Sequence, residues 1–395
     1  MRYCRRLRDA TPISQVAVLQ LERKSESVAM RILVAPDKFK GSLGAEDVGA
    51  AIARGLQSAF PTAQLDIVAL ADGGEGTAAA IRRAREGDWI AVAAHDALGR
   101  AGEGQYAWLA AARLAVMEMS AVAGLSQLAP GERDPMCAST FGVGEMLRDA
   151  AERDAAEIII GLGGSATNDG GFGMARALGF RFLDADAREL SGPVSDLLKL
   201  WRIVPPPNES SLPRITAACD VTNPLLGRGG ATSTFGPQKG ATPEQLEILE
   251  RSLSRLADIA ARTFAFDHRD VPGAGAAGGL GFGLLTFCNA KIRSGFEVVA
   301  EAIDLRARIS NVDIVITGEG KLDRQTLAGK GPAGVAHMAR ELGKPVYAIV
   351  GVATDDPEVR QLFDDIFALN DTSPGYGQTA SLLETRAREL ALRWP

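Results

Sequence analysis

The chain has 395 residues, of which 46% are apolar and 23% charged, and its formal net charge is −6. This length exceeds what one hydrophobic core usually organises, so we expect two domains. The composition is that of a globular protein, and an acidic chain without a dense Lys/Arg cluster is not expected to have a nucleic-acid partner.

Neither the cysteine spacing nor the hydropathy indicates a secreted or membrane protein. The four cysteines lie far apart without a Cys-x-x-Cys pair, which argues against a disulfide framework or a zinc site. The longest uncharged run, residues 271–290, is rich in glycine and lacks the dense apolarity of a transmembrane helix. We therefore expect a cytoplasmic protein that acts on small molecules and has no membrane partner.

Residues 1–29 form an extension with scattered arginines and no apolar segment of the kind that a signal peptide needs. Asp9, Glu22 and Glu26 disfavour a transit peptide, whereas Met30 directly precedes a clean predicted strand. We interpret the extension as a disordered tail or as the product of a mis-assigned start. On this interpretation, a chain that begins at Met30 keeps full activity.

From Met30 onward, short β-branched segments alternate with helical segments, a pattern typical of an α/β fold with a largely parallel sheet. Strands are expected at residues 31–35, 65–70, 89–94, 157–161, 215–219, 313–318 and 346–351. Helices are expected at residues 45–58, 140–153, 243–265, 325–341 and 379–392. Ligands of open α/β sheets bind outside the carboxyl ends of the strands, so the residues that follow each strand are the candidates for a site.

The first strand is followed by Lys38, Lys40 and Ser42, just before a predicted helix. A helix N-terminus together with two lysines is a plausible receptor for a carboxylate or phosphate. The alternative is a solvated turn in which Ser42 caps the helix.

The second strand is followed by the segment ADGGEGT, in which Asp72 and Glu75 flank two glycines. Asp72 is well placed to bind a metal or to accept a proton. The alternative is that Asp72 caps the next helix and Glu75 lies in its first turn.

Residues 161–171 (GLGGSATNDGG), called the glycine loop below, follow the strand EIIIG. We interpret them as a phosphate cradle, because glycines let backbone N–H groups approach a phosphate while hydroxyls donate to it. Asp169 would act on magnesium or on the acceptor hydroxyl, and Asp169→Asn should then reduce turnover without unfolding the chain. The residues that we assign to the cradle are Gly163, Gly164, Ser165, Thr167 and Asn168. The alternative is a loose connecting loop.

The glycine loop also matches the G-x-G-x-x-A pattern of dinucleotide-binding folds, and Asp184 lies near the place of a ribose-binding acid. This match is weak, because Asp169 would repel a pyrophosphate at the helix N-terminus unless a cation intervened. A nucleotide bound through magnesium accommodates Asp169 better than NAD does.

Two later strands end in further polar clusters. Asp220 and Asn223 follow the strand ITAAC, with a plain turn as the alternative for Asn223, and Lys239 lies on a Gly/Pro loop from which it could reach a phosphate. The strand DIVITG is followed by three more candidates, Glu319, Lys321 and Asp323. By contrast, the Gly-rich run 273–283 is expected to serve close helix packing.

Other phosphoryl-transfer and hydrolase patterns are missing from the sequence. No G-x-x-x-x-G-K-[ST] P-loop and no G-x-S-x-G elbow occurs. His268-Arg269-Asp270 resembles a protein-kinase catalytic loop but lacks its downstream Asn.

Six segments in order, APDKFKGSL, ADGGEGT, GLGGSATNDGG, CDVTNPLLG, FGPQKGA and ITGEGKLD, resemble those of the bacterial glycerate kinase family. The resemblance runs from about Met30 to about Arg393. It implies transfer of the ATP γ-phosphoryl group to (R)-glycerate, with Mg²⁺ as cofactor and the 2-hydroxyl favoured over the 3-hydroxyl. Within this frame, Asp72 or Asp169 would hold the metal, the glycine loop the phosphates, and Lys38 or Lys40 the glycerate carboxylate.

The resemblance also implies a discontinuous architecture. A flavodoxin-like domain of residues 30–95 and 295–395 would carry an inserted mixed α/β domain of residues 96–294, with the active site in the interdomain cleft. Two other functions stay open at this point: an NAD-dependent hydroxy-acid oxidoreductase and a catalytically silent metabolite-binding regulator. The oligomeric state and the tolerance for other hydroxy acids also stay open.

Overall fold

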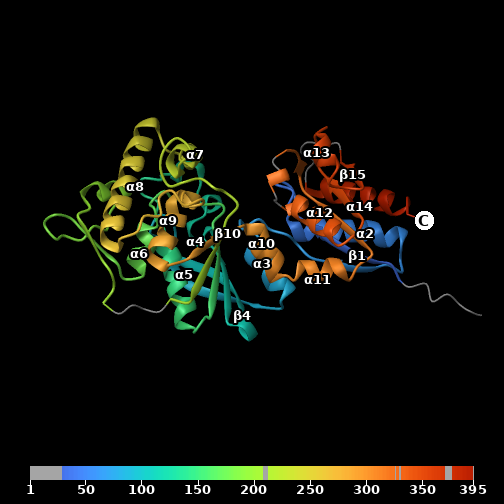
Figure 1. Ribbon diagram of the computed structural model, residues 1–395, viewed down its shortest axis with the longest axis horizontal. Helices are drawn as coiled ribbons and strands as arrows, with labels where there is room; N and C mark the ends of the chain where they lie inside the picture. Colours follow the sequence, from blue (N-terminus) through green and yellow to red (C-terminus); the bar gives the residue numbers. More distant parts are fainter. Residues whose placement is uncertain (1–28, 208–211, 325, 329–330, 370–375, 395) are drawn as a thin grey trace, which may run out of the picture.

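The computed structural model describes residues 29–207, 212–324, 326–328, 331–369 and 376–394. The prediction about residues 1–28 falls outside these ranges, as do residues 325, 329 and 330 of the helix expected at 325–341. Figure 1 shows two lobes, one built around the first and last parts of the chain and one built from its middle.

The first lobe contains a five-stranded parallel sheet with the spatial order β2-β1-β11-β13-β15. Its strands are β1 (Arg31–Pro36), β2 (Gln64–Ile67), β11 (Ile314–Gly318), β13 (Val346–Val350) and β15 (Asp365–Ala368). Counted along the chain, this is the flavodoxin-like order 2-1-3-4-5, which has its topological switch point between β1 and β11. The predicted α/β class and flavodoxin-like sheet are confirmed.

Alternating side chains of this sheet bury two different helical layers. Ile32 and Val34 of β1 share an apolar cluster with α2 (Ala45–Ala59) and α14 (Tyr376–Ala391). Leu33 and Ala35 share another with α11 (Leu305–Ser310) and α12 (Gly331–Glu341). The period of two along a strand therefore produces a three-layer α/β unit.

The second lobe contains a six-stranded sheet with the order β10-β9-β6-β5-β4-β3. Its strands are β3 (Asp88–His95), β4 (Ala101–Leu109), β5 (Leu114–Glu118), β6 (Glu157–Gly161), β9 (Arg214–Ala218) and β10 (Lys291–Arg293). The first three strands form an antiparallel meander, and the others pair in parallel. The second sheet therefore contains both parallel and antiparallel pairs.

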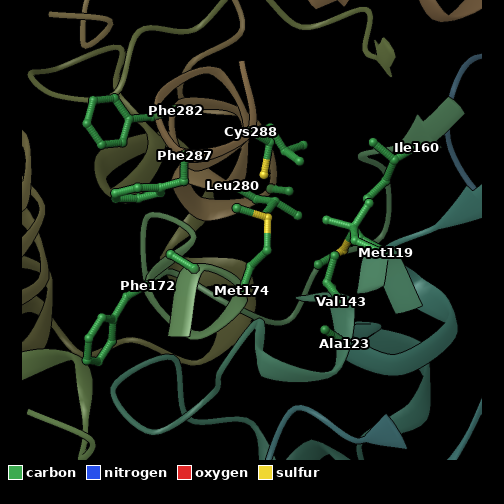
Figure 2. Packing of buried hydrophobic residues seen from close by; sticks show 14 of the residues in the cluster. Met119, Ala123, Val143, Ile160, Phe172, Met174, Leu280, Phe282, Phe287 and Cys288 are labelled. Carbon is green, nitrogen blue, oxygen red and sulfur yellow. The ribbon is translucent and has the colours of Figure 1, made fainter. Parts of the chain in front are cut away.

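One face of this sheet packs on a large apolar core that includes Met119, Met174, Leu280 and Phe287, which Figure 2 shows in close packing. The helices of this core are α5 (Phe141–Glu152), α6 (Phe172–Ala177), α8 (Pro243–Phe264) and α9 (Ala276–Cys288). Three further short α-helices of the described residues are α4 (Ser120–Ala123), α7 (Ala231–Phe235) and α13 (Pro357–Arg360). Two small two-stranded sheets pair β7 (Arg181–Leu183) with β8 (Arg202–Val204) and β12 (Lys321–Leu322) with β14 (Val352–Ala353). No helix in the described ranges is long and apolar enough to cross a membrane.

The opposite face of the six-stranded sheet joins the two lobes. Along β6, Ile158 and Ile160 belong to the core just described, whereas Ile159 belongs to the cluster that also contains Leu33 of β1. The helices α3 (Thr77–Ala84) and α10 (Gly295–Ala302) contribute to this shared cluster and lie between the lobes in Figure 1. The lobes are therefore connected by a continuous apolar core as well as by the chain.

Two boundaries differ from the sequence-based expectation. Residues 88–95 were expected in the first domain, but β3 pairs with β4 over its whole length in the second sheet, because hydrogen-bond partners and not chain order decide sheet membership. The helix expected at 325–341 is interrupted: Thr326–Ala328 form a 3₁₀ turn and α12 begins only at Gly331, whose φ is +38°. A positive φ does not occur inside a regular α-helix, so α12 cannot extend further toward the N-terminus through Gly331.

Candidate active site

The switch point of the first sheet places two polar segments side by side. Pro36 of β1 and Gly318 of β11 are register partners at the strand ends, and the N–H of Asp37 donates to the carbonyl of Gly318 at 2.8 Å. The residues that follow these strands, Asp37 with Lys38 on one and Glu319 on the other, therefore share one edge of the sheet. This is where ligands of flavodoxin-like sheets bind.

Lys38 connects this edge to the segment after β2. Its Nζ lies 3.9 Å from Asp72 Oδ1 and donates to the carbonyl of Glu75 at 2.9 Å. The two side chains of this ion pair are 25% and 27% exposed, so they remain accessible to a ligand. Asp72 Oδ1 also accepts from Gly74 N at 3.2 Å. Because α3 begins only after Gly76, the interpretation of Asp72 as a helix cap is wrong.

The N-terminus of α3 is instead capped from the other lobe. Oε1 of Glu118, at the end of β5, accepts from Gly76 N at 3.1 Å and from Ala78 N at 2.8 Å. Burial raises the pKa of Glu118, and these two hydrogen bonds act in the opposite direction. The sequence offered no signal for this residue, since β5 was not among the predicted strands.

The outer part of the glycine loop meets the same segment. Gly163 donates to the carbonyl of Gly73 at 3.4 Å, and a Cβ on Gly163 would lie 2.5 Å from the Cα of Gly74. A Cβ on Gly74 would in turn lie 3.8 Å from both Gly163 Cα and Lys38 Nζ. Lys38, Asp72 and Gly163, three predicted site residues from three strand ends and both lobes, are thus brought together.

The adjacent glycine is held near a carboxylate from the first lobe. A Cβ on Gly164 would lie 2.9 Å from Glu75 Oε1, which accepts from Ser126 Oγ at 3.1 Å. Gly164 also has a φ of +73°, so its conformation and its surroundings both favour glycine. The close contacts between the lobes therefore depend on glycines on both sides.

The inner part of the glycine loop is buried and is held from behind by Lys239. Lys239 is 1% exposed, and its Nζ donates to Ser165 Oγ at 2.8 Å and to the Thr167 carbonyl at 2.6 Å. Burial lowers the pKa of Lys239 to about 7, and the charge of Asp169 opposes this shift. The sequence predicts that Lys239 reaches a phosphate, whereas in this structure its amino group contacts Ser165 and Thr167 of the glycine loop.

Two other buried side chains of the glycine loop keep hydrogen-bonding capacity. Asn168 Nδ2 donates to Thr232 Oγ1 at 3.0 Å. Thr167 Oγ1 and Asn168 Oδ1 have no hydrogen-bond partner among the described residues. They are the polar groups of the inner loop that a ligand or a water molecule could still satisfy.

Asp169 is a buried structural carboxyl group in this fold. Its Oδ2 accepts from the N–H groups of Thr140 at 2.9 Å and Gly173 at 3.0 Å, and its Oδ1 accepts from Gly171 N at 3.1 Å. Thr140 Oγ1 donates to both oxygens. Burial raises the pKa of Asp169, against these hydrogen bonds. The expected contact of Asp169 with magnesium or substrate is therefore not what the geometry favours, because both oxygens are taken by the protein.

The glycines of α9 support the glycine loop, as the sequence predicted for the run 273–283. A Cβ on Gly278 would lie 1.9 Å from the Thr167 carbonyl, and Gly170 N donates to the carbonyl of Gly278 at 3.1 Å. Gly283 also approaches the loop, because a Cβ on it would lie 2.8 Å from the Gly170 carbonyl oxygen. The alternative of a loose connecting loop is therefore wrong.

The carboxyl groups at the end of β11 face those after β1. Glu319 Oε1 accepts from Thr326 Oγ1 at 2.8 Å, and Asp323 pairs with the exposed Lys321 at 2.9 Å. Burial raises the pKa of Glu319 to about 7, and the negative charges of Asp37 and Asp323 add to the effect while Lys40 opposes it. Glu319, Asp323 and Lys40 therefore belong to the same edge as Asp37.

Asp37 was not singled out from the sequence. Burial raises its pKa to about 6, with a further contribution from the charge of Asp72, against Lys38 and Lys40. Its position directly after the first strand was the signal that could have identified it. The identity of the neighbouring strand was needed to show that Glu319 lies opposite.

Three other predicted residues serve local structure. The Ser42 hydroxyl lies 2.5 Å from that of Thr379 in α14, and α2 begins after Gly44, so Ser42 is not its cap. Asp220 Oδ1 accepts from Ser294 Oγ at 3.0 Å and from Gly295 N at 2.8 Å, at the start of α10. Asn223 Nδ2 donates to the Gly229 carbonyl at 2.7 Å, which fits its interpretation as a turn residue.

A surface hollow of about 320 Å³ lies elsewhere, between α2, the residues after β2, and α3. Three of the charged side chains on its wall already have protein partners: Arg83 pairs with Glu46 at 2.8 Å, and Arg308 pairs with Asp66 at 2.6 Å. It contains none of the strand-end residues described above. We therefore place the candidate active site at the switch point and not in this hollow.

Comparisons with known proteins identify the family of the chain. A family model described as "Glycerate kinase family" matches residues 32–393. The chain belongs to the glycerate kinase family. This family consists of ATP-dependent kinases, so the predicted enzyme class is confirmed, and the oxidoreductase alternative finds no support.

Similar proteins cover nearly the whole chain of this family member. A "Glycerate kinase" of Bacillus subtilis is 41% identical over 92% of this chain and 97% of its own. A "Glycerate 2-kinase" of Escherichia coli is 42% identical over 83% of this chain and 86% of its own. A crystal structure of "putative glycerate kinase 2" from Salmonella typhimurium LT2 is 40% identical, with a TM-score of 0.82 over 92% of this chain and 98% of that one.

Proposed function

We propose that this protein transfers the γ-phosphoryl group of ATP to the 2-hydroxyl of (R)-glycerate and yields 2-phosphoglycerate. The observation that carries the proposal is the convergence of Lys38, Asp72 and Gly163 from both lobes at the carboxyl ends of their strands. Phosphoryl transfer depends mainly on positioning and charge neutralisation, which a lysine, a carboxylate and a glycine backbone supply together. The name of the Escherichia coli relative supports the 2-position.

The two parts of the site bind the two substrates, ATP and glycerate. Gly163 and Gly164 line the position of the ATP phosphates, with Lys38 beside the group that is transferred. Lys40, whose charge acts on both Asp37 and Glu319, holds the carboxylate of glycerate. The site would then lie where the lobes meet, which keeps the expectation of an interdomain site as part of this proposal.

The described residues fit a Mg²⁺ ion that arrives with ATP. They include no group of three or more His, Cys, Asp or Glu side chains that could hold a metal. Mg²⁺ usually takes one or two carboxylates and fills its other positions with phosphate oxygens and water. The accessible Asp72 fits that role, whereas Asp169 does not, because its oxygens are already occupied. When bound, the ion supplies positive charge to the phosphate oxygens.

The deciding experiment combines the protein with magnesium ATP, (R)-glycerate and enolase, and follows phosphoenolpyruvate with and without phosphoglycerate mutase. Phosphoenolpyruvate without mutase establishes transfer to the 2-hydroxyl. A signal that needs mutase moves the transfer to the 3-hydroxyl. Absence of ATP consumption in both reactions would refute the proposal and favour a silent metabolite-binding protein.

We also propose that the reaction takes place in the cytoplasm, where ATP and magnesium are available. Cys137 and Cys288 carry free thiols, and the pKa of the Cys288 thiol is raised by burial to about 12. A reducing compartment suits such thiols. Cell fractionation with an antibody against the chain would test this assignment.

A further inference from the structure

Asp37 and Glu319 form a carboxyl pair at the switch point, with Asp37 Oδ2 beside Gly331 at the start of α12, 3.3 Å from the position that a Cβ on that glycine would take. Each follows a residue of one register pair, Pro36 and Gly318, so their backbones are about 5 Å apart across neighbouring strands. Both side chains are only partly exposed. Two ionised carboxyl groups this close together repel one another unless a proton or another positive charge lies between them.

The pair differs from the other buried carboxyl groups in its hydrogen bonds. Asp169 accepts from three backbone N–H groups and a hydroxyl, and Glu118 accepts from two backbone N–H groups. Asp37 accepts from the N–H of its neighbour Lys38 at 2.7 Å, and Glu319 accepts from Thr326 Oγ1 at 2.8 Å.

Within the described part of the chain, neither Asp37 nor Glu319 forms an ion pair within 4.0 Å. Burying acceptors with so few donors costs free energy unless a ligand supplies them. This imbalance is a common feature of functional sites.

The surrounding charges indicate which ligand would do so. Lys38 and Lys40 act on Asp37, and Lys40 also acts on Glu319, while Asp72 and Asp323 are the acidic neighbours. A small molecule that carries a carboxylate near Lys40 and hydroxyl groups beside it would satisfy both Asp37 and Glu319. A 2,3-dihydroxycarboxylate has this pattern, with donors only a few bonds from its negative charge.

We propose that Asp37 and Glu319 form the acceptor-hydroxyl site, in which Asp37 takes the proton of the hydroxyl that is phosphorylated and Glu319 accepts a hydrogen bond from the other hydroxyl. This inference rests on the proposed function. Asp37 has the proton-accepting role because it adjoins Lys38, which pairs with Asp72 and lies near Gly74, the glycine that packs against Gly163 on the phosphate side. Glu319, on the neighbouring strand, favours acceptors that carry a second hydroxyl group, because it accepts a hydrogen bond from that group.

The phosphoryl transfer needs no reactant besides ATP and the acceptor. The O–H bond of the acceptor breaks and its proton passes to a carboxylate oxygen of Asp37. The hydroxyl oxygen forms a bond to the γ-phosphorus, and the bond from that phosphorus to the β,γ-bridging oxygen breaks, so that ADP leaves with the electron pair. Asp37 then releases its proton to water after the product has departed.

The test compares Asp37→Asn and Glu319→Gln with wild type in steady-state kinetics, varying glycerate, ATP and Mg²⁺ separately. Asp37→Asn should lower kcat by about 10²–10⁴-fold, the usual contribution of a general base, and leave the KM for ATP within threefold. Glu319→Gln should raise the KM for glycerate about tenfold or more with a smaller change in kcat. Asp355→Asn, at a 93% exposed side chain of the same lobe, is the matched control and should behave as wild type.

The outcomes separate this inference from the proposed function. If wild type phosphorylates glycerate and both variants retain its kcat and KM, the inference is wrong and the proposed function stands. A tenfold higher Mg²⁺ requirement with an unchanged KM for glycerate would make the pair metal ligands and also overturn it. If wild type does not use glycerate, the proposed function fails, and this inference falls with it.

Both substitutions are isosteric and remove mutual repulsion, so we expect thermal midpoints no lower than that of wild type. Should Asp37→Asn nevertheless fail to fold, the pH profile of wild-type kcat supplies the readout. A proton acceptor requires kcat to fall as the pH drops through the range in which the pair gains a proton. A kcat that is constant from pH 5 to 8 would overturn the inference.

Discussion

The substitution Asp169→Asn distinguishes a structural from a catalytic role for the most deeply buried acid of the glycine loop. The carboxyl group accepts from the N–H groups of Thr140, Gly171 and Gly173. An amide has the same shape, but its NH₂ group cannot accept. Whichever way the amide is oriented, at least one of these buried N–H groups faces another donor.

The magnitude follows from the two possible orientations. With the nitrogen in the place of Oδ2, the N–H groups of Thr140 and Gly173 both lose their acceptor; with the nitrogen in the place of Oδ1, only Gly171 does. The second orientation is cheaper, and one unsatisfied buried donor costs about 1–3 kcal/mol. The remaining hydrogen bonds lose their charge assistance, so we expect a total near 3 kcal/mol. For a lobe of this size, that is about 6–12 °C in the thermal midpoint.

The assay is thermal unfolding by circular dichroism together with kcat measured well below the midpoint. Asp154→Asn is the control, because Asp154 is an 83% exposed aspartate of the same lobe and should leave the midpoint unchanged. We expect the midpoint of Asp169→Asn to fall while kcat of the folded protein stays within about tenfold of wild type. An unchanged midpoint with kcat lowered a hundredfold or more would refute the structural role and restore the sequence-based expectation of direct action.

Four further predictions concern the glycine loop and the start of α3. Lys239→Met should raise the KM for ATP about tenfold, since Ser165 Oγ and the Thr167 carbonyl lose their donor. The pKa of Lys239, about 7 in the folded chain, lies below its ordinary value of 10.5, so between these pH values the unfolded chain binds more protons and the free energy of unfolding rises with pH by up to about 1.4 kcal/mol per unit. Urea denaturation at pH 7 and pH 9 should show a larger rise in the free energy of unfolding for wild type than for Lys239→Met. An equal rise in both proteins would contradict this prediction. Gly278→Ala should destabilise the glycine loop severely, because its Cβ would lie 1.9 Å from the Thr167 carbonyl and the residue has a φ of +66°. The control Gly229→Ala has open space around it and should keep the wild-type thermal midpoint. Equal midpoints for the two variants would show that the close approach of Gly278 is not needed. Glu118→Ala should lower the thermal midpoint by removing the acceptor of Gly76 and Ala78, and Glu118→Gln should recover most of it; a Gln variant as unstable as Ala would show that charge and not hydrogen bonding matters.

Much of the local structure was predictable because it depends on neighbours in sequence. The β-branched run Ile158 to Ile160 predicts β6 at its observed bounds, and the capping pattern at Thr242 marks the start of α8. By contrast, β4 contains two glycines and a charged residue and is an inner strand only because β3 and β5 pair with it. Strand pairing of this kind depends on partners that composition does not identify.

Residue patterns alone were enough to predict the α/β class, the strand-end clusters and, through the order of six motifs, the family. It also supplied the chemical groups, since lysines, carboxylates and glycines after strands indicate phosphate chemistry wherever the strands lie. The tertiary structure decided which of these groups face a ligand. In the sequence Asp169 looks catalytic and Lys239 looks like a phosphate ligand, but both are buried and hydrogen-bonded within the protein, which favours a role in the scaffold of the glycine loop. Asp37 follows the first predicted strand, but its burial and its neighbour Glu319 became visible only in the fold, because the pairing of β1 with β11 joins residues nearly 300 positions apart in the chain.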